Sequence, residues 1–168
     1  MEKDREMKTV VLNCIDLEAL IYACEQAEEE SKDVLIRLSC TGTCSIYEAM
    51  AVYDYLKIAN ASSAFNVHME IVGMVGMLDL LILTGIDPDK RGFSVNSHLN
   101  FWKPNGFTWG TAEEAKLAIE ARLEQVSNVV SLLAQNTEYN KEEIEEMMEK
   151  GTYLNREDLV SANVLGGE

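Results

Sequence analysis

Short apolar segments typical of buried strands alternate, in the first half of this chain, with longer segments whose apolar residues recur at helical spacing. The strand-like segments cover residues 8–13, 33–38 and 66–72, and helix-like segments follow them over 16–29, 45–60 and 77–85. Consecutive strands joined by helices run in the same direction, because each helix carries the chain back along the sheet. The sequence therefore predicts an α/β fold with a mainly parallel sheet of βαβ units.

The second half adds a different set of elements. Short strands are expected over 92–96 and 98–102, a long helix over about 112–135, an acidic helix over 140–149 and a short helix over 156–162. Two helix starts carry a capping box, Ser45 with Glu48 and Asn140 with Glu143. No repeat, low-complexity tract or linker divides the chain, so residues 1–168 are expected to form a single domain.

The charge and composition exclude several classes of partner. The 29 acidic and 14 basic residues give a formal net charge of −15, which repels the phosphates of nucleic acids and of anionic membrane surfaces. The longest apolar run, residues 71–83, is shorter than the about 20 residues that cross a bilayer, and the N-terminus carries no apolar signal segment. We therefore expect a cytoplasmic protein with no nucleic-acid or membrane partner. The four cysteines and two histidines lack zinc spacing, so no metal or cofactor is predicted.

The stretch from Glu70 to Gly85 is typical of a strand that enters an apolar helix through a glycine-rich turn. In many hydrolases this layout exposes a serine nucleophile at the start of the helix. Here the turn, Gly73 to Met77, contains no serine, cysteine or threonine. The sequence therefore predicts the scaffold of a nucleophile turn without its nucleophile.

Four segments in the same order resemble the Clp protease proteolytic-subunit family. They are "IRLSCTGTCSIYEAMAVYDYLK" (36–57), "IVGMVGMLDLLILTG" (71–85), "VNSHLNFWKP" (95–104) and "NKEEIEEMMEKGTYLNREDLVSANVL" (140–165). The resemblance implies a crotonase-like α/β fold. It also implies that the ribbon and long helix over about 103–136 form a projecting handle.

The resemblance assigns three positions to the family's serine, histidine and aspartate, and here they hold Gly76, Trp102 and Gly151. In place of the family's Pro-Gly-Gly oxyanion loop, this chain has Thr41, Gly42 and Thr43. These residues, together with Met77 after Gly76, form the vestigial oxyanion loop that the resemblance implies. Glycine supplies no attacking atom, and an indole N–H cannot act as a base. We therefore expect a catalytically inactive subunit with a structural or regulatory role in a ring assembly. Trp102 is expected to fill part of the former cleft and to bury most of its surface.

Two enzymatic alternatives remain open from the sequence. One is a serine endopeptidase of the same family whose site is misassigned, with Ser39, Ser45 or Ser97 as nucleophile. The other is a crotonase-like enzyme that acts on acyl thioesters, with Asp79 or Glu48 as base. His98 lies about 13 Å along its strand from Trp102, too far to replace the missing base directly.

The long helix carries a seam of apolar residues at intervals of four and three, and this seam is the predicted oligomer interface. Its members are Ile119, Leu123, Val126, Val130 and Leu133. The expected partners are further copies of the chain in a ring-type homo-oligomer and an active Clp-type subunit. The resemblance implies N-terminal axial loops that contact a ring ATPase, but the first strand begins near Lys8 and few residues precede it. Docking to a ring ATPase is therefore doubtful.

Overall fold

The computed structural model describes residues 6–12, 16–30, 32–39, 45–61, 65–103 and 108–166. Its larger sheet has four parallel strands in the order β1-β2-β3-β5. Their bounds are β1 (Met7–Leu12), β2 (Asp33–Leu38), β3 (Val67–Ile71) and β5 (Arg91–Phe93). The predicted α/β class and parallel sheet are confirmed, although β5 starts one residue earlier and ends three residues earlier than expected.

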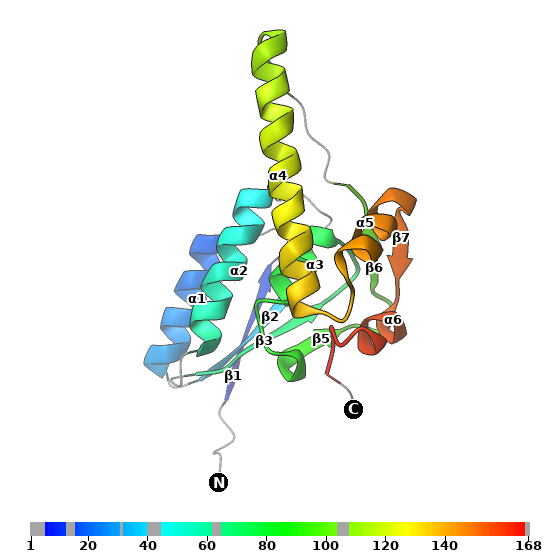
Figure 1. Ribbon diagram of the computed structural model, residues 1–168. Helices are drawn as coiled ribbons and strands as arrows, with labels where there is room; N and C mark the ends of the chain where they lie inside the picture. The colour runs from blue at the N-terminus through cyan, green and yellow to red at the C-terminus, as the bar shows by residue number, and fades with distance from the viewer. Residues whose placement is uncertain are drawn as a thin grey trace.

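Three helices lie against one face of this sheet (Figure 1): α1 (Leu17–Glu30), α2 (Ile46–Ala61) and α3 (Met77–Leu83). Alternate residues of the central strands are fully buried beneath them, among them Ile36 and Met69. Each such side chain contributes roughly 1.5–3 kcal/mol by leaving water. The predicted cap of α2 is present, since Glu48 N donates to Ser45 Oγ and Ser45 N to the Glu48 carboxylate.

A smaller sheet of three strands lies beside the first, in the order β4-β6-β7. Its strands are β4 (Met74–Gly76), β6 (His98–Phe101) and β7 (Thr152–Leu154). β4 and β6 are parallel, whereas β7 pairs antiparallel with β6. One face of this sheet is buried, with Val75, Leu99, Phe101 and Leu154 at most 7% exposed. The other face therefore points away from the core.

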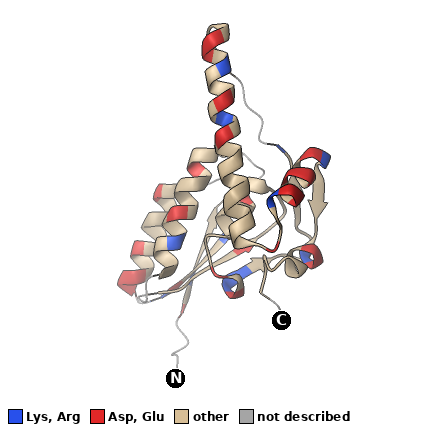
Figure 2. Ribbon diagram, viewed as in Figure 1, with Lys and Arg blue, Asp and Glu red and all other residues tan. Residues whose placement is uncertain are grey.

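Helix α4 (Ala112–Asn136) extends well beyond the body of the molecule at its N-terminal end (Figure 1). A capping box of Thr111 and Glu114 fixes that end, since Glu114 N donates to Thr111 Oγ1 and Thr111 N to Glu114 Oε2. Along the part that projects, the surface is acidic with two interspersed bases (Figure 2). In the described part of the chain, nearly every residue of this outer half is exposed.

The apolar seam of α4 is divided between surface and core, which corrects the prediction of one continuous interface. Ile119 and Leu123 are 52% and 65% exposed, whereas Val130 and Leu133 are at most 2% exposed. Val126 is partly buried against the core. The C-terminal half of α4 packs on α2 and α3, so Val130 and Leu133 are core residues of their own subunit.

The C-terminal elements are α5 (Lys141–Lys150) and α6 (Arg156–Ser161). The predicted capping box of α5 is present, because Glu143 N donates to Asn140 Oδ1. The segment after α6 is held by Arg91, whose buried guanidinium donates to the carbonyl oxygens of Ile86 (2.7 Å), Val164 (2.8 Å) and Thr84 (3.3 Å). Burial lowers the pKa of Arg91 to about 10.

Within the described ranges, none of the helices combines the length and apolarity that a membrane span requires.

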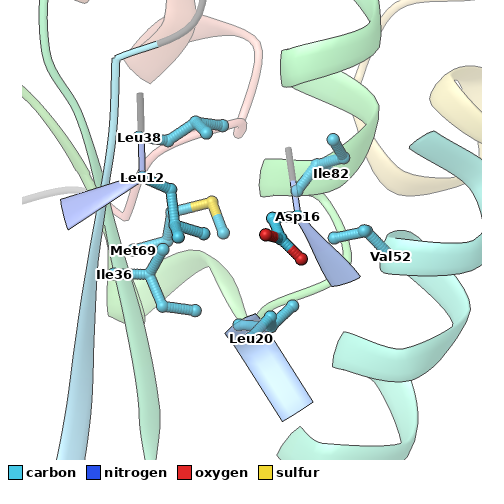
Figure 3. A pocket seen from close by; sticks show the side chains of 8 residues that line it. All are labelled: Leu12, Asp16, Leu20, Ile36, Leu38, Val52, Met69 and Ile82. Atoms are coloured by element: carbon cyan, nitrogen blue, oxygen red, sulfur yellow. The ribbon is translucent and has the colours of Figure 1, made fainter. Parts of the chain in front are cut away.

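A small void lies between the larger sheet and its helices, with about 10 Å³ of free space (Figure 3). Its walls are apolar except for the carboxylate of Asp16, and they include Leu20, Ile36 and Met69. This space holds one water at most, so it is not a pocket for a peptide or an acyl chain.

Candidate functional site

The outward face of the small sheet brings together the three positions assigned from the resemblance. Gly76 on β4 is the register partner of Asn100 on β6. The β6–β7 register pairs Phe101 with Thr152, which places Trp102 opposite Gly151. Because side chains alternate along a strand, Asn100 and Trp102 point to the same face. Positions far apart in the sequence therefore converge on one surface.

Trp102 and Gly151 are in direct contact. A Cβ atom on Gly151 would lie 2.9 Å from Trp102 Nε1 and 3.3 Å from its Cδ1. Gly151 is also the C-cap of α5, with a positive φ of 62° that disfavours other residues. The indole therefore occupies the space that a side chain at position 151 would need.

The indole is 56% exposed, so the expectation that Trp102 buries most of its surface is wrong. It lies over the glycine cap of α5 and is open to solvent on its other side. Met74 (53% exposed) and Tyr153 (57% exposed) belong to the same face. The face is therefore open and partly aromatic.

The turn into α3 is held by a buried carboxylate. Gly76 N donates to Asp79 Oδ2 at 2.7 Å, and Asp79 is fully buried. Gly73, with a φ of 90°, is the residue of this turn that requires glycine. Gly76 has an extended backbone with a φ of −108°, a conformation open to any residue. The missing side chain at 76 is therefore not imposed by backbone geometry.

The two carboxylates considered as alternative bases are both used in helix caps. Asp79 caps α3, and it is inaccessible to solvent. Glu48 caps α2, and the bond from the Ser45 backbone N–H, followed by that with the Ser45 side chain, lowers the pKa of Glu48. A lower pKa weakens a carboxylate as a base.

The alternative serine nucleophiles are also placed by the structure. Ser97 is 1% exposed, and its Oγ donates to Ile71 O (3.2 Å) and accepts from Gly73 N (2.8 Å). Ser45 Oγ accepts from Glu48 N. Ser39 is exposed at the end of β2. In the described part of the chain, no side-chain hydrogen bond joins any of these serines to a histidine.

Some residues of the predicted site fall outside the described ranges. The vestigial oxyanion loop, Thr41, Gly42 and Thr43, is among them. Met77 is described, and it begins α3. Among the described residues, no three His, Cys, Asp or Glu side chains are grouped to hold a metal ion.

Asn100 and Tyr153 also belong to this face, and sequence reasoning missed them. Asn100 Oδ1 is buried and finds no hydrogen-bond partner among the described residues. The alternation of side chains along residues 98–102 would have placed Asn100 on the same face of the strand as Trp102. Tyr153 gave no such signal, because its three-residue strand is too short to show a period.

Known proteins are similar to this chain over most of its length. A family model described as Clp protease matches residues 15–162. The ATP-dependent Clp protease proteolytic subunit of Ligilactobacillus salivarius (strain UCC118) is 23% identical over 141 residues, which cover 84% of this chain and 69% of that protein. The family match spans most of the chain, from the start of α1 to the end of α6. This chain therefore belongs to the Clp protease family.

Proposed function

We propose that this chain is a non-catalytic member of the Clp protease family with a structural or regulatory role in a ring assembly. The observation that carries the proposal is the convergence of Gly76, Trp102 and Gly151 on one face of the small sheet. A serine-type peptidase needs a nucleophile, a base and a group that orients the base. None of the three side chains present has the chemistry of the group it replaces.

The contact between Trp102 and Gly151 supports the assignment of these two positions. A catalytic histidine and its carboxylate must be in contact for the carboxylate to orient the ring. The two positions were assigned from separate segments of the sequence, and they meet in space. Loss of a serine protease triad lowers turnover by on the order of a million-fold.

An assembly role is supported by the outer half of α4. Leu117 and Leu123 are more than 60% exposed there, Ile119 is 52% exposed, and Trp109 just before the helix is 90% exposed. Large apolar side chains gathered on one projecting element are typical of an interaction surface. We propose that this surface contacts further copies of the chain and, in a mixed ring, an active Clp-type subunit.

The catalytic part is tested with purified protein, fluorogenic peptides and a fluorophosphonate probe, with an active Clp-type peptidase as positive control. We expect neither hydrolysis nor labelling above that of heat-denatured protein. Peptide turnover that the probe abolishes while it labels one serine would overturn the proposal. Mapping of that serine would then distinguish Ser39, Ser45 and Ser97.

A further inference from the structure

Among the described residues, no strand pairs with the outer edge of β1 in the larger sheet. β1 is the terminal strand, and β2 is its partner. Asp33 N donates to Glu6 O and Ser39 N to Leu12 O, both at 3.0 Å. Even-numbered residues of β1 therefore direct their backbone groups toward β2, because backbone groups alternate in direction along a strand.

The remaining residues of β1 direct their backbone N–H and C=O groups away from the sheet. They are Met7, Thr9 and Val11, and no bond to these groups is found among the described residues. The same residues expose their side chains, with Met7 48% and Val11 60% exposed. The edge thus presents unpaired backbone groups and apolar side chains together.

Natural edge strands are normally protected by charges, prolines or bulges. β1 contains no proline, and its register with β2 is continuous from end to end. Its one charged residue, Lys8, bonds to Glu30 (3.4 Å) at the end of α1. The open edge therefore carries the features of a strand-pairing site.

Charge decides what kind of strand fits this edge. Helix α1, whose C-terminal turn lies beside Lys8, contains five glutamates and no basic residue. They are Glu18, Glu25, Glu28, Glu29 and Glu30. A second copy paired antiparallel across a twofold axis would bring its own α1 to the same side of the joined sheet, where the two acidic helices would repel. A basic segment is attracted instead.

We propose that the β1 edge binds an extended, basic polypeptide segment of another protein as an added strand. Its backbone bonds to Met7, Thr9 and Val11, which is strand addition to an open edge. Its apolar side chains lie over Met7 and Val11, and its Lys or Arg side chains alternate with them toward the glutamates of α1. This site is separate from the small sheet and from the projecting part of α4.

The test uses the full-length protein and a labelled synthetic peptide of about ten residues in which Val and Lys alternate. Fluorescence anisotropy should show saturable binding that weakens several-fold between about 50 mM and 300 mM salt. A peptide with Glu in place of Lys should not bind. Amide exchange should show new protection at Met7, Thr9 and Val11 and unchanged protection at Val10, whose N–H already faces β2.

Thr9→Pro removes an outward N–H without removing a bond to β2, and we expect it to weaken binding by about tenfold. Thr9→Val is the matched control, since it keeps the N–H and the branched side chain. Should Thr9→Pro unfold the protein, the exchange experiment on the unmodified chain still decides. Equal binding of the Glu peptide, or unprotected edge amides in the complex, would overturn the proposal. The proposal would also be overturned if, without peptide, the protection of the edge amides rose with protein concentration. A second copy of the chain would then occupy the edge.

Discussion

Trp102 Nε1 lies 2.9 Å from the point at which Gly151 would carry a Cβ atom. Non-bonded heavy atoms are essentially never that close to a Cβ, so a side chain at 151 would force the indole to shift. The glycine also holds a positive φ of 62°. The two positions are therefore coupled by space, and the backbone conformation adds a separate constraint at position 151.

This coupling predicts the stability of Gly151→Ala. The substitution should lower the free energy of unfolding by about 1–3 kcal/mol, because it combines a left-handed backbone with a steric clash. In a Trp102→Ala background the loss should be smaller by at least about 0.5 kcal/mol. Urea denaturation of the wild type, the two single variants and the double variant measures both losses of stability.

Gly92→Ala is the control for that cycle. Its Cβ would meet Glu70 at 3.5 Å, an ordinary contact, and Gly92 has no positive φ. We expect a clearly smaller effect than at Gly151. Additive losses at 102 and 151 would show that the contact carries no energy.

Restoring the nucleophile alone should not restore chemistry. Gly76→Ser fits the extended backbone at this position, but its register partner on β6 is Asn100, whose amide cannot take the serine proton. We expect no fluorophosphonate labelling of Gly76→Ser. Labelling above background should require Gly76→Ser together with Trp102→His and Gly151→Asp, since His at 102 removes the indole from 151. Mass spectrometry of the labelled peptide measures this, and equal labelling of the single and triple variants contradicts it.

Two substitutions on α4 should separate folding from assembly. Val130 is 2% exposed, so Val130→Asp should destabilise the subunit by about 3–5 kcal/mol. Leu123 is 65% exposed, so Leu123→Asp should change the stability of the subunit by less than about 0.5 kcal/mol. It should nevertheless lower the mass of the assembly.

Light scattering and thermal unfolding together report these outcomes. Glu124→Gln, a neighbouring change without loss of apolar surface, is the control for Leu123→Asp. A wild-type protein that remains an 18.8 kDa monomer at high concentration would exclude self-assembly through this surface. An unchanged assembly mass in Leu123→Asp would place the contact elsewhere.

The cap of α2 predicts an acid-sensitive contribution to stability. Bonds from Ser45 hold the pKa of Glu48 below its ordinary value in the folded protein. A lowered folded pKa stabilises the fold above the ordinary pKa, and this stabilisation is lost as pH falls through the folded pKa. Glu48→Gln should therefore show a shallower fall of Tm below about pH 4.3 than the wild type. Parallel Tm profiles of the two proteins at low pH would contradict this.

Local signals in the sequence predicted local structure well. Ser45 with Glu48 and Asn140 with Glu143 were sufficient to place two helix starts, because a capping box involves residues three apart. Asn163, the second residue after α6, has a φ of 53°, a left-handed conformation that asparagine tolerates better than most residues. These features depend on neighbouring residues alone.

Features that depend on distant contacts were not predictable in the same way. The periodicity of α4 marks one apolar face, but only its packing on α2 and α3 shows that Val130 is core and Leu123 is surface. The antiparallel pairing of β7 carries no signal in three residues. The contact of Trp102 with Gly151 depends on that pairing, so no local pattern predicted it, although the family resemblance assigned both positions to one site.

Helix α4 is anchored at one end and unsupported at the other, which has a thermodynamic consequence. Its inner half is fixed by buried Val129, Val130 and Leu133, whereas its outer half depends on the Thr111 cap and on local pairs such as Lys116 with Glu120 (3.8 Å). A helical segment of this length without tertiary contacts is only marginally stable in water. In an isolated subunit the outer turns will therefore fray and re-form in fast exchange while the core stays folded. A binding partner will encounter an ensemble of helix lengths, and it will select the conformers in which the helix is longest.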